Sequence, residues 1–239
     1  MSQSQFLRTE MLLGSAAMEA LRRAHVAVVG IGGVGAYAAE TLARAGIGTL
    51  TFVDQDTVGE SNLNRQLIAL HSTIGRPKAE VMAERALDIN PNCHVAAMVY
   101  RYEPDTAEEF WACGPFDYVV DAIDLVSCKL HLIETAVKRD IPVISALGTG
   151  NKLDASRLQI ADIAETSGCP LARVVRKELR RRGIEHHKVV FSPEEAHESD
   201  QSHEAPPPGR RSIPASVPWV PAVAGLLLGS AVVRDLTGI

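Results

Sequence analysis

The sequence predicts an α/β protein with a doubly wound, mostly parallel sheet and a C-terminal extension. Between residues 25 and 146, short apolar segments that suit buried parallel strands alternate with segments of helical periodicity. The first apolar segment runs into a cluster of glycines that a helical segment follows. After residue 150 the alternation gives way to basic, proline-rich and apolar segments. Repeated strand–helix units of this length are typical of a doubly wound sheet.

The elements are expected in a regular order along the chain. Pro77 suits the first turn of a helix, because the amide hydrogen that it lacks would have no partner there. Gly183 is expected to end a basic amphipathic helix. The predicted strands are 26–29, 49–54, 94–100, 117–121, 141–146, 157–163 and 188–191, and the predicted helices include 33–45, 77–89 and 171–182.

Three parts of the chain differ in composition. We expect a helical segment at 1–24, a nucleotide-binding α/β domain at 25–165, and an extension at 166–239 that ends in an apolar helix. Within the extension, residues 192–211 are rich in Glu, Ser, His and Pro, a composition that predicts a mobile loop. This loop is either a lid over substrate or an insertion without a role.

Composition limits the class of protein. The 239 residues are 46% hydrophobic, which suffices for one large core. The net charge of -5 argues against a protein that coats nucleic acid, DNA included, but allows a local basic patch. No secretory leader pattern precedes or follows Glu10, so we expect a cytoplasmic protein. The apolar stretch 217–233 is short for a bilayer and begins with prolines, which favours a buried or dimer helix over membrane contact.

A phosphate-binding turn is predicted between the first strand and the first helix of the α/β domain. Glycines allow a tight turn and a close approach of backbone amides to an anion at the helix N-terminus. Asp54, at the end of the next strand, suits a ribose hydroxyl. This Rossmann-like pattern also fits an NAD-binding dehydrogenase. The glycines are Gly30, Gly32, Gly33 and Gly35.

Further charged residues favour a triphosphate over a dinucleotide. Arg65 and Lys78 would neutralise a triphosphate and its leaving group, whereas a glycine turn alone largely satisfies a diphosphate. Asp121 and Asp124 follow a strand at the sheet edge where such folds bind ligands, and a carboxylate there suits Mg²⁺. Taken singly, each has an ordinary structural alternative: a turn cap for Asp54, a surface charge for Arg65 and a helix cap for Asp124.

In order and spacing, these residues resemble the adenylation domain of the ubiquitin-activating superfamily over roughly residues 6–165. The resemblance implies ATP·Mg at the glycine turn, Asp54 on the ribose, Arg65 and Lys78 on phosphates, and Asp124 at magnesium and the reacting centre. It also implies a homodimer in which Arg8 enters the partner's ATP site, the alternative being an exposed tail residue. The matching polar residues are Asp54, Asp56, Asn62, Arg65, Gln66, Lys78, Asp121 and Asp124.

The extension resembles one branch of that superfamily, the tRNA threonylcarbamoyladenosine dehydratases. Segments 150–154, 169–180, 188–192 and 212–235 carry this likeness. The branch implies adenylation of a carboxylate on a modified adenosine in tRNA, followed by ring closure and net loss of water. No enzyme thioester is needed, which suits a chain without Cys-x-x-Cys pairs. Cys169 begins a helix and is either an activated thiol or, as we prefer, a packed core residue.

The basic helix 171–182 is a candidate tRNA surface. Its cations recur at three- and four-residue steps, so a helix gathers them on one broad face that would bind phosphates in a salt-sensitive way. The alternative is a solvated face paired with Glu178. The candidate residues are Arg173, Arg176, Lys177, Arg180 and Arg181.

Two other functions remain open at this point. Within the superfamily, the chain would adenylate a ubiquitin-like sulfur carrier. From another class, it would be an NAD-binding oxidoreductase or a nucleotide sensor, although no acid–base pair for hydride transfer is evident. A monovalent-cation requirement and a partner protein from a sulfur relay or tRNA modification are also left open.

Overall fold

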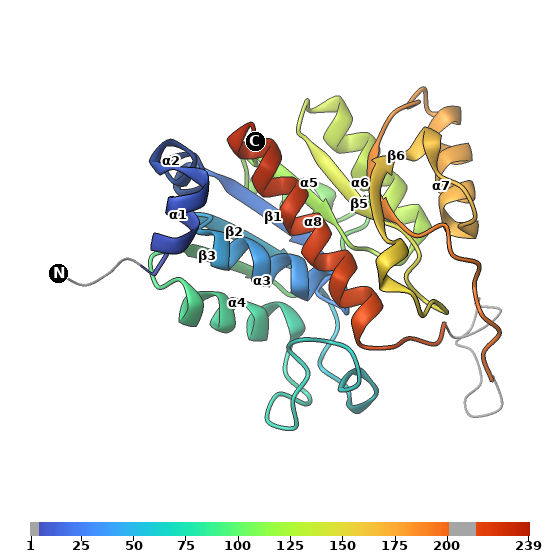
Figure 1. Cartoon of the computed structure of the whole chain (residues 1–239), viewed down its shortest axis with the longest axis horizontal. Helices are drawn as coiled ribbons and strands as arrows, with labels where there is room; N and C mark the ends of the chain where they lie inside the picture. The colour runs from blue at the N-terminus through green and yellow to red at the C-terminus, as the bar shows by residue number, and fades with distance from the viewer. Residues whose placement is uncertain (1–4, 201–213) are drawn as a thin grey trace.

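The computed structural model describes residues 5–200 and 214–239, which form one seven-stranded sheet with helices on both faces (Figure 1). All strand pairs are parallel except β6–β7, which is antiparallel. The predicted fold class is therefore confirmed. In sheet order the strands are β3 (His94–Met98), β2 (Thr49–Val53), β1 (His25–Val29), β4 (Tyr118–Asp121), β5 (Val143–Ala146), β7 (Lys188–Phe191) and β6 (Gln159–Asp162).

Alternate side chains of β1 point to opposite layers of the core. Val26 and Val28 pack with the helices of one face, whereas Ala27 and Val29 pack with those of the other. Because both faces are covered, β1 is apolar throughout, as its sequence indicated. The first face carries α2 (Ser15–Arg23), α3 (Gly35–Ala45), α4 (Lys78–Ile89) and α8 (Trp219–Thr237); the second carries α5 (Ala107–Ala112), α6 (Val126–Lys138) and α7 (Pro170–Arg181).

The element boundaries differ from the predictions at several ends. The predicted strand 94–100 stops at Met98, and Pro77 is the cap residue just before α4 rather than its first turn. Three short 3₁₀ helices, η1 (Glu60–Asn62), η2 (Ala155–Arg157) and η3 (Ile163–Glu165), join the longer elements. Within the predicted helical segment 1–24, the described residues form α1 (Leu7–Leu13) and α2.

Helix α8 crosses the molecule and packs closely on α3 (Figure 1). A Cβ at Gly225 would lie 2.3 Å from the Val34 carbonyl oxygen, and one at Gly229 would lie 2.6 Å from Thr41 Cβ. Only glycine therefore allows the two helices to approach this closely. In the described chain, α8 is the one helix long and apolar enough to cross a membrane, and its Val220, Ala224 and Leu228 are fully buried against the core.

The prediction of a mobile loop is wrong for the first part of 192–211. Ser192 and Glu194 are buried. Lys152 Nζ donates to the Ser192 carbonyl oxygen at 2.5 Å, and the amides of Leu153 and Asp154 donate to the Glu194 carboxylate at 2.9 and 3.1 Å. The acidic side chain thus serves as an internal partner, which composition does not reveal. Residues 201–211 of the predicted loop lie outside the described residues.

Candidate active site

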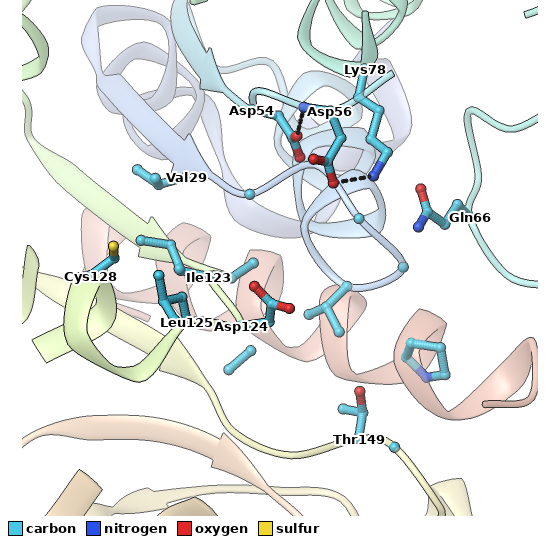
Figure 2. A pocket seen from close by; sticks show the side chains of 18 of the residues that line it. Val29, Asp54, Asp56, Gln66, Lys78, Ile123, Asp124, Leu125, Cys128 and Thr149 are labelled. Atoms are coloured by element: carbon cyan, nitrogen blue, oxygen red, sulfur yellow. Dashed lines mark hydrogen bonds and ion pairs between the residues drawn. The ribbon is translucent and has the colours of Figure 1, made fainter. Parts of the chain in front are cut away.

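A cavity of about 580 Å³ opens at the carboxyl ends of β1, β2, β4 and β5. Ligands of doubly wound folds bind at this edge, where the strand order reverses between β1 and β4. The glycine turn, the end of β2, the start of α4 and the turn after β4 all contribute to its wall. Figure 2 shows Asp54, Asp56 and Lys78 on one side of this cavity, with Asp124 and Thr149 across from them.

The glycine turn needs glycine for two different reasons. Gly30 has φ +93°, and a Cβ there would lie 2.7 Å from the Ala122 carbonyl oxygen. Gly32 and Gly33 line the cavity and leave their backbone open to an anion. Gly35 does not line it, which corrects its assignment as a nucleotide contact. A Cβ on Gly35 would lie 1.7 Å from the Gly30 carbonyl oxygen, so Gly35 instead lets α3 pack under the turn.

Asp54 directly follows β2 and holds two segments of the cavity wall together. Its Oδ2 accepts the amide of Ile31 at 2.6 Å, and its Oδ1 accepts the amide of Asp56 at 2.8 Å (Figure 2). Burial raises the pKa of this carboxyl, although both amides and Lys78 favour its ionised form. Each oxygen keeps a further acceptor position, so the geometry suits the predicted ribose contact.

Two cations, Lys78 and Arg65, line the cavity. Lys78 begins α4, is buried, and donates from Nζ to Asp56 Oδ2 at 2.9 Å. Arg65 donates to the Ser61 carbonyl oxygen and Asn64 Oδ1 and is in no ion pair among residues 5–200 and 214–239. Burial lowers its pKa, but an arginine remains charged.

Gln66 and Asn62 complete this wall of the cavity. Both line it. Asn62 Oδ1 accepts the amide of Gly59 at 3.0 Å, which fixes the turn that carries Arg65. Gln66 is buried, and its Oε1 has no hydrogen-bond partner, so its amide is not fully satisfied by the protein.

The two aspartates at the carboxyl end of β4 have different environments. Asp124 is exposed and its carboxylate lies in the cavity (Figure 2). Asp121 is fully buried, does not line the cavity and pairs with Lys129 at 2.6 Å. The assignment of Asp121 as a nucleotide contact is therefore wrong, because its carboxylate points into the sheet–helix interface beneath the turn.

The predicted basic residues of α7 also separate into groups. Arg173, Lys177 and Arg180 are exposed and form no ion pair within the described part of the chain. Arg176 instead donates to the carbonyl oxygen and Oγ1 of Thr166, both at 2.6 Å, which corrects its assignment to the tRNA surface. Arg181 pairs with Glu178 at 2.6 Å.

Cys169 is buried and starts α7, where its Sγ accepts the Ala172 amide at 3.5 Å. It does not line the cavity. The preferred interpretation of Cys169 as a packed helix-start residue therefore agrees with the structure.

Comparison with known proteins decides the family. The sequence profile of the ThiF family matches residues 6–239. The chain belongs to the ThiF family. It is 45% identical over 240 residues to the tRNA threonylcarbamoyladenosine dehydratase of Bacillus subtilis, covering 97% of this chain and 94% of the relative. It is 43% identical over 176 residues to the Escherichia coli enzyme of the same name.

Solved structures of that Escherichia coli dehydratase share the fold over nearly the whole chain. The complex with AMP has a TM-score of 0.88 at 35% identity, and the complex with ATP has a TM-score of 0.87 at 36% identity. Each comparison covers 98% of this chain and 94% of the other. ATP binding is therefore a property of close structural relatives of this ThiF-family protein.

Sequence reasoning missed part of the cavity of this ThiF-family chain. Tyr100 and Arg101 line it just after β3, and Thr149 and Leu171 line it after β5 and at the start of α7. Arg101 donates from Nε to Gln55 Oε1 at 3.1 Å. Their place after strand ends was a usable signal, since the carboxyl ends of parallel strands share one edge.

Proposed function

We propose that this protein is an ATP-dependent dehydratase that acts on threonylcarbamoyladenosine in tRNA. The observation that carries the proposal is the cavity itself. It combines the glycine turn, Arg65, Lys78 and Asp124, in a chain 45% identical to a dehydratase of that name along 97% of its length. Residues 25–165 form the adenylation part, and residues 166–239 add the basic helix and the closing helix.

The proposed reaction has two steps. A carboxylate oxygen of the threonyl group attacks the α-phosphorus of ATP, the bond to the β-phosphate oxygen breaks, and pyrophosphate leaves. A nitrogen of the same modified group then attacks the activated carbonyl carbon, loses its proton, and displaces AMP. The oxygen removed from the nucleoside leaves with AMP, so the net change in the nucleoside is the loss of one water.

The residues divide this work by position. Arg65 and Lys78 stabilise the charge that develops on the phosphates, and the amides of the glycine turn orient them. Asp54 binds the ribose. The side-chain amide of Gln66 donates a hydrogen bond to the nucleotide. Asp56 is the counterion of Lys78 at 2.9 Å, and an arriving phosphate takes over that role.

Mg²⁺ fits the donor set around Asp124. Magnesium is commonly bound by one or two carboxylates together with substrate phosphates and water, rather than by an all-protein cage. In the described residues no group of three or more His, Cys, Asp or Glu forms such a cage. Asp124 would hold the ion against the phosphates, where its charge would favour departure of pyrophosphate.

The exposed face of α7 is the proposed tRNA contact. Arg173, Lys177 and Arg180 lie at i, i+4 and i+7 and therefore on one side of the helix. Leu171, in the first turn of α7, lines the cavity. Phosphates bound along this face would thus lead the modified nucleoside toward the site of chemistry.

Arg8 completes the proposed assembly. It is exposed on α1 and does not line the cavity of its own chain, so it would reach a nucleotide only from a second copy. We therefore retain the homodimer and a cytoplasmic location as parts of the proposal.

The alternatives make different demands. Activation of a sulfur carrier through a thioester would require an accessible cysteine at the cavity. Cys169 is buried outside the cavity, and Cys128, which lines it, is also buried. A DTT-sensitive adduct with a carrier, lost in Cys169→Ala, would favour that alternative. Binding of NAD without affinity for ATP·Mg would favour the oxidoreductase.

The deciding experiment uses tRNA that contains threonylcarbamoyladenosine. We expect incubation with ATP·Mg to convert this nucleoside into a product lighter by one water, seen by nucleoside mass spectrometry, with AMP formed in equal amount. Omission of ATP is the control. An unchanged nucleoside in the complete reaction would refute the proposal.

A further inference from the structure

A buried ion pair lies directly beneath the candidate site and is not used by the reaction scheme. Lys129, on α6, and Asp121, the last residue of β4, are both 0% exposed. Lys129 Nζ lies 2.6 Å from Asp121 Oδ2. Neither residue lines the cavity.

Each of these two side chains also bonds to a cavity-lining turn. Asp121 Oδ1 accepts the amide of Ile123 at 3.0 Å, within the turn that presents Asp124. Lys129 Nζ donates to the Ala146 carbonyl oxygen at 3.0 Å, at the start of the turn that presents Thr149. One pair of side chains thus connects both turns.

Ser145, on β5, and His187, just before β7, lie near the pair. Ser145 lies opposite Asp121 in the β4–β5 register, and its Oγ lies 2.7 Å from His187 Nε2. Burial, with the nearby charge of Lys129, lowers the pKa of His187 to about 3, so this imidazole is neutral at physiological pH. The Lys129 ammonium therefore has Asp121 as its counterion.

Stability alone is a weak reason for this arrangement. Burying two charges costs solvation free energy that their attraction often only balances, and apolar residues of similar volume frequently stabilise a core as well. Apolar side chains, however, could not bond to a backbone amide on one turn and a carbonyl on the other. The pair therefore does what apolar residues could not do, because it holds the two turns at a fixed spacing.

We propose that Lys129 and Asp121 are positioning residues that set the distance between Asp124 and Thr149 across the reacting centre. The proposal rests on the function proposed above. ATP would still bind without the pair, because Asp54 and Lys78 lie across the cavity from Asp124 and Thr149 (Figure 2). Alignment of the attacking carboxylate with the α-phosphate would be lost.

The test is the double variant Asp121→Asn with Lys129→Met, which removes both charges and leaves no unpaired ion. A misplacement of the reacting groups by about 1 Å can lower a reaction rate about 100-fold. We therefore expect kcat for AMP formation to fall roughly 10- to 100-fold. The dissociation constant for ATP should stay within about twofold of the wild-type value, because Asp54 and Lys78 on the opposite wall keep their positions.

The control is Lys188→Met with Asp235→Asn. It removes a partly exposed pair, 2.6 Å apart, that joins the start of β7 to α8. Its kcat should equal that of the wild type even if its melting temperature falls. A kcat near wild type in the Asp121–Lys129 variant, or parallel losses of ATP affinity and kcat in it, would overturn the proposal. Absence of AMP from the wild-type reaction would instead reject the proposed function.

Hydrogen exchange on the wild-type protein supplies a test that needs no folded variant. If one pair holds both turns, the amides of Ile123 and Leu147 should share one opening free energy under native conditions. Independent opening of these two amides would also contradict the proposal.

Discussion

At the scale of single residues, the cavity separates side chains that bind from side chains that support. Asp54, Lys78 and Asp124 line it, whereas Asp121 and Gly35 lie behind it. The sequence placed all five at strand or helix ends but could not distinguish these roles. Asp121 and Asp124 are three residues apart, and only the direction of each side chain in the turn after β4 separates support from contact.

Asp124→Ala tests the reacting side of the cavity. Because Asp124 is exposed, its loss should leave the melting temperature unchanged, while AMP formation should fall by about 100-fold or more. Lys78→Ala should lower AMP formation to a similar extent. Its fold should be retained, because the partner carboxylate of Asp56 is half exposed and can be solvated. Steady-state AMP release and thermal melting measure both. Normal turnover by either variant would reject the assigned roles.

The raised pKa of Asp54 predicts a pH dependence of ribose binding. The ionised carboxylate accepts hydrogen bonds, and a raised pKa means that it becomes protonated at a higher pH than an ordinary aspartate. Affinity for adenosine, which lacks the titrating phosphates of ATP, should therefore weaken as pH falls through that raised value. Calorimetry across the acid range would show it. A pH dependence that persists in Asp54→Asn would assign the effect to another group.

At the scale of elements, helix ends and helix contacts position the site. α4 starts with Lys78, α6 follows the turn of Asp124, and α8 brings Pro221 to the cavity wall. Strand and helix periodicity identified β1 to β5 and α7 to within a few residues. It did not place β7 between β5 and β6, because register and strand order depend on packing between segments distant in the chain.

The contact of α8 with α3 depends on Gly225. We expect Gly225→Ala to lower the free energy of unfolding by about 1–3 kcal/mol, because its Cβ would overlap the Val34 carbonyl oxygen. Ser230→Ala in the same helix should change it by less than about 0.5 kcal/mol. Urea unfolding compares the two. Equal stability of both variants would mean that α8 is not tightly packed on α3.

The α7 surface can be tested by charge reversal. Replacing Arg173, Lys177 and Arg180 by Glu should weaken tRNA binding and reduce the salt dependence of log K by about two to three units, at roughly 0.7–0.9 per phosphate contact. ATP affinity should not change, since these residues lie outside the cavity. Binding titrations at several salt concentrations measure this. Reversal of Arg181, which is paired with Glu178, is the control and should have a smaller effect.

At the scale of the whole molecule, one sheet brings all parts of the site to one edge. The glycine turn and the residues after β2 were predictable because parallel strands place their carboxyl ends together. Glu194 and Arg176 were not, since their partners Leu153 and Thr166 become neighbours only in the folded chain. The likeness to the dehydratases of Bacillus subtilis and Escherichia coli extends over this whole arrangement.

The most direct test of the central claim follows one oxygen atom. With ¹⁸O in the threonyl carboxylate of the modified tRNA, attack on the α-phosphate predicts that the released AMP carries one labelled oxygen. Mass spectrometry of AMP and of inorganic phosphate separates the outcomes. Unlabelled AMP, or label in inorganic phosphate, would contradict the account of this cavity as a site of carboxylate adenylation.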